Sequence, residues 1–248
     1  MDINLVKNQY SLSIRILSDG FSLSVYDENY QLISAKHITP VHGADKAESL
    51  QEILVSHKEL HLAYKDIVII CESEYHTIVP EIFYKAENEK EFLRLQHPSL
   101  PDSYQIFHSK LPLRQCTMIY GLEQNVIKVF QSHFQQVNPE SHLVSIAKKI
   151  ISEDKNKLTL WVRQEETDCI VYNDHRIVLF NKYAYEQPED ILYHVLNIYQ
   201  QLNLNPSEFC TELYDNENSN NIALLKKHLP GVIIKSKKTA HEDYQWKI

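Results

Sequence analysis

Hydrophobic and polar residues alternate along the first part of the chain. Apolar side chains occupy every second position from Leu12 to Ile16, and a second alternating run follows residue 20. A period of two predicts strands that bury one face, and the dipeptide Asp19-Gly20 between the runs is typical of a hairpin turn. A third strand, a helix and a short apolar strand at residues 67–71 complete the pattern. This part of the chain is therefore predicted to fold as β-β-β-α-β.

Residues 157–235 predict the same order of elements a second time. Two alternating runs and a third strand come first, and Pro188 then opens a helix at a position where its missing N–H costs nothing. The turn after the second strand is alike in the two copies, with Val25-Tyr26-Asp27 in the first and Val171-Tyr172-Asn173 in the second. Equal order at similar spacing predicts an internal duplication.

The stretch between the copies follows a different pattern. A strand is expected to end at Pro80, a helix is expected over residues 87–96, and further prolines precede a strand at residues 117–120. We interpret this stretch as a small inserted α/β subdomain. The predicted domains are a first half at residues 1–154, with the insertion at about 75–120, and a second half at residues 155–248.

Composition narrows the class of protein. The chain has 248 residues, 43% of them hydrophobic, and a formal net charge of −8, which disfavours binding to a phosphate backbone. We therefore expect no nucleic-acid partner.

No apolar run approaches the roughly 18 residues of a membrane span, and the first residues lack the apolar segment of a signal peptide. The four cysteines are widely separated, without metal-ligand spacing. A reduced, cytoplasmic protein is the expectation.

Three antiparallel strands, a helix and a parallel strand, present twice with an insertion in the first copy, resemble the actin-like ATPase fold, an α/β fold of two duplicated ribonuclease-H-like halves. The segment His76-Thr77-Ile78-Val79-Pro80, the small subdomain after it and the strand and helix from Cys116 to Val137 are similar in order to pilus-assembly and cell-division actin-like proteins. The whole chain looks most like a bacterial domain of unknown function that has this fold.

The resemblance implies where a nucleotide would bind, and the sequence departs from it there. Members that bind ATP carry an acidic residue and glycines in the first strand and turn of each half, and a Gly-Gly pair after a late strand. Glycine is needed because backbone N–H groups must approach the phosphates without a Cβ in the way. Here Trp161 stands at the acidic position of the second half. The degenerate positions are Asp19, Gly20, Arg163, Gln164, Glu165, Glu166, Thr167, Asp168, Asp215 and Asn216.

Charge is expected to oppose a nucleotide as well. One carboxylate about 5 Å from one phosphate charge costs roughly 3 kcal/mol at an effective dielectric of 20. The summed repulsion of a triphosphate by Glu165 and Glu166 would exceed ~8 kcal/mol, which is the whole binding free energy at a micromolar Kd. A bridging Mg²⁺ would offset part of this, so the loss of glycines is the firmer argument.

Other candidate sites are weaker. Glu72, Glu74 and His76 follow a buried strand, at the edge where α/β proteins place ligands, so they line a cleft or form a polar loop. The acidic residues at 165, 166 and 168 suit a divalent cation, although a solvated turn is the favoured interpretation. The pair of histidines at 57 and 61 lacks the glutamate of the metalloprotease motif. No catalytic residue, metal site or cofactor is predicted.

The favoured hypothesis is a non-catalytic actin-like scaffold that binds a protein partner or itself. Fifteen tyrosines, Tyr193 among them, suit either half-buried packing or an interface. One alternative is a divergent ATPase or kinase that holds nucleotide by other side chains. Another is a small-molecule binder that uses the cleft between the halves.

Overall fold

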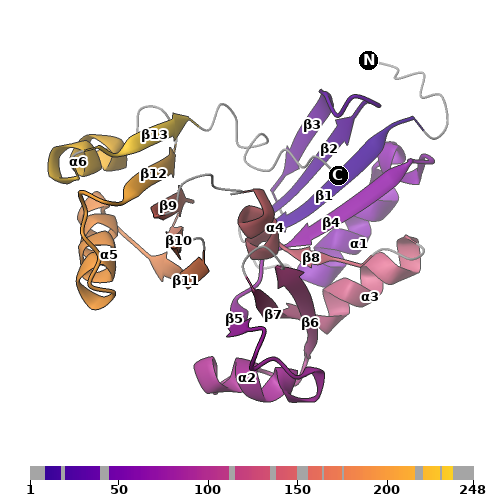
Figure 1. Cartoon of the computed structure of the whole chain (residues 1–248). Helices are drawn as coiled ribbons and strands as arrows, with labels where there is room; N and C mark the ends of the chain where they lie inside the picture. Colours follow the sequence, from indigo (N-terminus) through magenta and orange to yellow (C-terminus); the bar gives the residue numbers. More distant parts are fainter. Residues whose placement is uncertain are drawn as a thin grey trace. The chain divides into compact units, whose positions relative to one another are not determined.

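The computed structural model describes residues 9–17, 20–39, 45–111, 115–134, 138–149, 156–163, 165–174, 176–215, 220–229 and 231–236 (Figure 1). The chain divides into two compact units close to residue 150. Each unit is described below by itself.

The first unit is built on a five-stranded mixed sheet of order β3-β2-β1-β4-β8. β1 pairs antiparallel with β2 and parallel with β4. The sheet therefore has an antiparallel part, β3-β2-β1, and a parallel part, β1-β4-β8. The elements are β1 (Ser11–Leu17), β2 (Gly20–Tyr26), β3 (Leu32–Ile38), α1 (Lys46–Ser56), the short 3₁₀ helix η1 (Lys58–His61), β4 (Asp66–Cys71), α3 (Gln124–His133), β8 (Glu140–Ser141) and α4 (His142–Lys149).

Alternation in β1 and helical spacing in α1 and α3 build the core of this unit. Leu12, Ile14, Leu50 and Ile127 are buried, and α1 packs against α3. Asp45 caps α1, because its carboxylate accepts hydrogen bonds from the first free N–H groups of the helix. The sequence predicts this helix start correctly.

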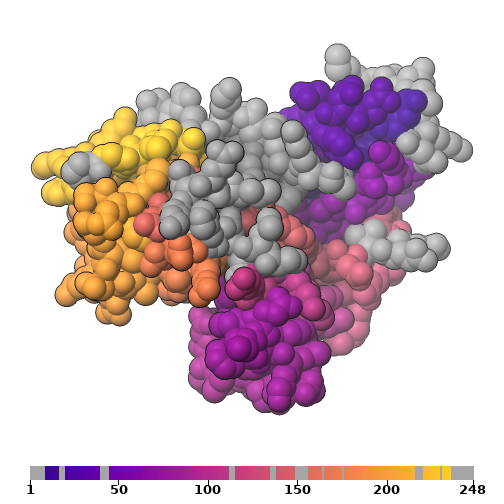
Figure 2. Space-filling model, viewed as in Figure 1, coloured from indigo at the N-terminus to yellow at the C-terminus, as the bar shows by residue number. Residues whose placement is uncertain are grey.

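The insertion forms a small lobe of the first unit, drawn in purple and magenta in Figure 2. Its antiparallel sheet has the order β5-β7-β6, and α2 packs on β5 through the buried Leu93. The elements are β5 (Tyr75–Pro80), the 3₁₀ helix η2 (Ala86–Asn88), α2 (Glu89–Gln96), β6 (Tyr104–Leu111) and β7 (Cys116–Glu123).

The second unit repeats the first without an insertion. Its sheet has the order β11-β10-β9-β12-β13, and its core joins Leu160, Val171, Ile191, Leu213 and Leu225. The elements are β9 (Lys157–Val162), β10 (Glu166–Asn173), β11 (Arg176–Ala184), α5 (Pro188–Gln201), β12 (Cys210–Asp215), α6 (Asn220–His228) and β13 (Ile233–Ser236).

The same irregularity marks both sheets. The register of β2 against β3 shifts between Val25 and Tyr26, and the register of β10 against β11 shifts between Val171 and Tyr172. A β-bulge adds one residue to a strand and bends it locally. These are the residues whose repeat in the sequence predicts the duplication, so the two copies share a structural detail as well as the order of their strands.

No helix among the described residues is long and apolar enough to cross a membrane.

Candidate functional site

The first candidate site is the turn between β9 and β10, where the sequence resemblance implies a glycine-rich loop in nucleotide-binding members. Two backbone hydrogen bonds already occupy this turn: the N–H of Arg163 donates to the carbonyl of Glu166 at 2.7 Å, and the N–H of Tyr185 donates to the carbonyl of Glu165 at 3.0 Å. The Arg163 amide therefore points into the hairpin and is not available to an incoming phosphate.

The side chain of Arg163 forms ion pairs with two carboxylates of β10. Its Nε lies 3.0 Å from Oδ2 of Asp168, and its Nη2 lies 2.9 Å from Oε2 of Glu166. Lys182 of β11 completes the cluster, with Nζ 2.9 Å from Oε1 of Glu166. Asp168 is fully buried, so its charge requires the guanidinium beside it.

This cluster corrects two expectations from the sequence. Glu166 and Asp168 are not part of a solvated acidic turn, because both are held by cations. The negative charge of Glu166 is compensated by Arg163 and Lys182, so repulsion by this residue is a weak reason for excluding a phosphate. The engaged backbone amide and side chain of Arg163 are stronger reasons for expecting no phosphate here. Thr167, also predicted as a degenerate position, is buried and donates a hydrogen bond to the carbonyl of Trp161 at 3.4 Å.

An aromatic pair lies beside the ion cluster. Trp161 stands opposite Asp168 in the pairing of β9 with β10 and beside Tyr214 in the pairing of β9 with β12. The two rings stack with centroids 4.6 Å apart and planes 18° apart, and Trp161 is 2% exposed. The position to which the sequence resemblance assigns a carboxylate in nucleotide-binding members holds a buried indole in this chain.

Asp215, another position predicted from the resemblance, is also engaged in contacts within the unit. Asp215, at the end of β12, accepts a hydrogen bond from the amide of Asn221 at 2.9 Å. The Tyr185 hydroxyl donates to the carbonyl of Arg163 at 2.5 Å. Burial raises the pKa of Tyr185 most, the charge of Asp215 raises it further, and a hydrogen bond with Asn221 lowers it. Tyr185 therefore connects the β9–β10 turn to the end of β12.

The remaining predicted positions are Asp19, Gly20, Gln164 and Asn216. Asp19, Gln164 and Asn216 fall outside the described residues. Gly20 begins β2 with a φ of 139°, a conformation that favours glycine. Gly20 pairs with Leu17 across the hairpin, so this glycine serves the turn itself.

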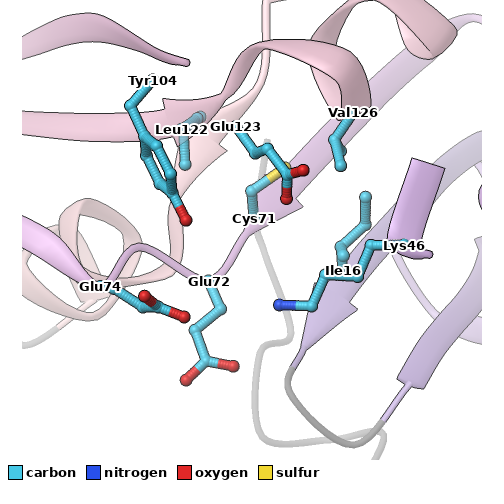
Figure 3. A pocket seen from close by; sticks show the side chains of 9 residues that line it. All are labelled: Ile16, Lys46, Cys71, Glu72, Glu74, Tyr104, Leu122, Glu123 and Val126. Carbon is cyan, nitrogen blue, oxygen red and sulfur yellow. The ribbon is translucent and has the colours of Figure 1, made fainter. Parts of the chain in front are cut away.

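A second candidate site is a pocket of the first unit beside the carboxyl ends of β1 and β4 (Figure 3). Glu72 and Glu74 line it, as one interpretation of the sequence anticipates, but His76 does not. His76 is buried in the insertion, where its ring centroid lies 6.0 Å from that of His97. Reasoning from the sequence misses the other polar side chains of the pocket, namely Lys46, Cys71, Tyr104 and Glu123.

Burial and nearby charges shift the pKa values of two side chains that line the pocket. Tyr104 and Cys71 both line the pocket, and Figure 3 shows the Cys71 sulfur beside the Glu123 carboxylate. Burial, with the charges of Glu74 and Glu123, raises the pKa of Tyr104 to about 12. Burial raises the pKa of Cys71 to about 12, against a lowering effect of Lys46. The cavity volume of about 30 Å³ suits one or two water molecules, far below the several hundred cubic ångströms of a typical cofactor site.

The two histidines at i and i+4 do not form a metal site. His57 ends α1, and its Nε2 lies 2.7 Å from Nζ of Lys36. His61 ends η1, and its ring packs edge-on against that of His133. Within the described part of the chain, no three or more His, Cys, Asp or Glu side chains are placed to hold a metal ion.

The chain resembles solved structures of other proteins over more than nine tenths of its length. A Bacteroides thetaiotaomicron protein with an actin-like ATPase fold and unknown function superposes with a TM-score of 0.78 at 21% identity, over 92% of this chain and 91% of that one. The cytoplasmic domain of EpsL, an inner-membrane component of the type II secretion system of Vibrio cholerae, gives 0.53 at 12% identity, over 95% and 92%. A chain of the PilM–PilN type IV pilus biogenesis complex gives 0.53 at 13% identity, over 95% and 93%.

These likenesses confirm the predicted actin-like ATPase fold. No curated protein matches the sequence. A protein-family model matches residues 3–232, and the chain accordingly belongs to the family described as "Protein of unknown function (DUF3822)".

Proposed function

We propose that this chain is a non-catalytic actin-like scaffold, which binds protein and does not hydrolyse ATP. The observation that carries the proposal is the ion pair between Arg163 and the fully buried Asp168. It lies at the turn where a nucleotide-binding relative would place the phosphates. In this proposal the fold is retained, and the side chains at that turn stabilise the sheet and do not bind a nucleotide.

Admitting a triphosphate at this turn would have a large energetic cost. Arg163 would have to leave Asp168, and an uncompensated buried carboxylate costs about 3–5 kcal/mol. Micromolar affinity amounts to only about 8 kcal/mol in total. The Trp161–Tyr214 stack and the Asp215–Asn221 hydrogen bond would have to rearrange in addition.

The neighbours in fold support a role in binding protein. One is a chain of the PilM–PilN complex and another is a component of a secretion system, as their names state. An actin-like fold can therefore serve inside a protein assembly, and function follows from the site more than from the fold.

Thermal unfolding with millimolar Mg-ATP tests the proposal. A ligand present at a hundred times its Kd stabilises a protein by about 2.7 kcal/mol, which raises the Tm of a chain of this size by roughly 5–10 °C. We expect a change below about 1 °C, with a nucleotide-binding actin-like protein as the positive control. A rise of several degrees that needs both ATP and Mg²⁺ would refute the proposal.

A further inference from the structure

The pocket beside the carboxyl ends of β1 and β4 carries a net negative charge. Three carboxylates line it, those of Glu72, Glu74 and Glu123, together with the ammonium group of Lys46, so the formal charge of its lining is −2. A concave site with an excess of one sign of charge raises the local concentration of the opposite ion. The pocket therefore favours a cation and disfavours a phosphate.

The charged groups of this pocket lack partners inside the protein. Within the described part of the chain, the side chains of Glu74, Glu123 and Lys46 form no ion pair and no hydrogen bond. Asp102 and Glu140, in the same unit, are each paired with a lysine. The carboxylates of the pocket are thus available to a ligand.

A buried thiol also lines the pocket. Cys71 is 4% exposed, and its sulfur lies beside the Glu123 carboxylate (Figure 3). Among the residues that the structure describes, this thiol has neither a disulfide nor a hydrogen-bond partner. Sulfur is a weak acceptor, and a buried polar group gains from a partner. A ligand with N–H donors would supply one.

A bare metal ion does not fit these carboxylates. A bound divalent cation needs several oxygen ligands within about 2.5 Å of one point. No three or more His, Cys, Asp or Glu side chains in the described ranges are placed to hold such an ion. In Figure 3 the Glu123 carboxylate is separated from those of Glu72 and Glu74. An organic cation, whose N–H donors form longer hydrogen bonds, suits this arrangement better.

The size and the remaining lining of the pocket indicate which organic cation fits. The cavity volume is about 30 Å³, which suits a water molecule or an ammonium group, a compact charge with three N–H donors. Ile16, Leu122 and Val126 add apolar surface to the lining. A carbon chain can pack on such a surface while its charged end reaches polar groups.

We propose that this pocket binds a primary alkylammonium group, which is the end of a lysine side chain or of a free diamine. The carboxylates of Glu74 and Glu123 bind the charge, and Ile16 and Val126 contact the carbon chain. The inference goes beyond the proposed scaffold function and does not depend on it, because it concerns another site and is measured without nucleotide.

A ¹H–¹⁵N NMR titration of the full chain with 1,4-diaminobutane tests the site. We expect saturable shifts of the Glu74 and Glu123 amide signals, with a Kd of about 0.1–5 mM. Glu123→Gln is expected to weaken binding by about threefold or more, because it removes one carboxylate charge. The matched control is Glu91→Gln, which makes the same charge change at an exposed residue of α2 and leaves the Kd unchanged.

Lys46→Met is expected to have the opposite effect and to tighten binding by about twofold or more, since it removes the cation that competes with the ligand. The dispersion of the amide signals shows whether each variant is folded. No saturable shift up to about 20 mM diamine, far above the expected Kd, overturns the proposal. Equal weakening by Glu123→Gln and Glu91→Gln overturns it as well.

Two further probes separate the sources of the ammonium group. Nα-acetyl-lysine methylamide represents a lysine of a protein partner, and its Nε-acetylated form keeps the carbon chain without the charge. Tighter binding of the lysine compound than of the diamine identifies a protein partner, and the reverse order identifies a free diamine. Equal binding of the Nε-acetylated form contradicts the proposal. Failure at this pocket leaves the ATP measurement unaffected, so the two proposals fail separately.

Discussion

Arg163 and Asp168 lie on opposite sides of the β9–β10 hairpin and meet through Nε and Oδ2 at 3.0 Å, with the carboxylate fully buried. The pair joins the two strands at the turn for which we propose a structural role. A buried charge whose partner is removed is strongly destabilising, whereas removing both charges together is often neutral. This asymmetry gives the pair a measurable signature.

Arg163→Met is expected to lower the free energy of unfolding by about 3–5 kcal/mol, because it leaves Asp168 buried without a cation. The double variant Arg163→Met/Asp168→Leu is expected to recover most of that loss. Urea unfolding at pH 7 measures both values. Equal destabilisation by the single and double variants would show that the ion pair is not what holds the turn.

Trp161→Ala is expected to cost about 3–5 kcal/mol, since it empties the space of a fully buried indole stacked on Tyr214. Val55→Ala is a suitable control, because Val55 is 72% exposed and surface changes stay within about 0.5 kcal/mol. Similar losses for the two variants would mean that the indole contributes little.

The cysteines are expected to react with iodoacetamide in a fixed order at pH 8. Cys210 is half-buried and reacts first. Burial raises the pKa of Cys71 to about 12 and raises that of Cys169 as well, and the thiolate is the reactive species. Mass spectrometry of native protein should show Cys210 labelled while Cys71 and Cys169 remain unlabelled until urea is added. Early labelling of Cys71 would contradict the description of the pocket.

Asp190→Asn is expected to change the pH dependence of stability. Hydrogen bonds from the backbone N–H groups of Glu186 and Gln187 lower the pKa of Asp190 in the folded state. A lowered carboxyl pKa stabilises the fold above the unfolded value of about 3.9 and loses this effect as the pH falls through the folded pKa. The variant should therefore be less stable than the wild type at pH 7, and the gap should narrow below about pH 4. A gap that stays constant from pH 7 to pH 3 would exclude this cause.

Local signals made much of the fold predictable. Alternation around Leu12 and the cap at Asp45 predict β1 and the start of α1, and Pro188 predicts the start of α5. The sequence does not predict the strand β6 (Tyr104–Leu111), because polar residues such as Gln105 and His108 break the apolar pattern between two prolines. The two-residue β8 is too short to leave any pattern.

The candidate site was only partly predictable, for a physical reason. The sequence identified Arg163, Glu166 and Asp168 as departures from glycine, but their ion pairs depend on how the strands pair. Lys182 lies opposite Asp168 only because of the β10–β11 register, and Tyr185 reaches the Arg163 carbonyl from 22 residues along the chain. Contacts between residues so far apart in the sequence depend on how the strands pair, so no short sequence motif predicts them.

Equilibrium dialysis of the wild-type chain against labelled ATP, with and without Mg²⁺, is the most direct test of the central claim. We predict no saturable binding up to 1 mM ATP, because we propose that the Arg163–Asp168 ion pair and the buried Trp161 leave no place for the phosphates. A Kd below about 100 µM, with one nucleotide bound per chain, would contradict the account.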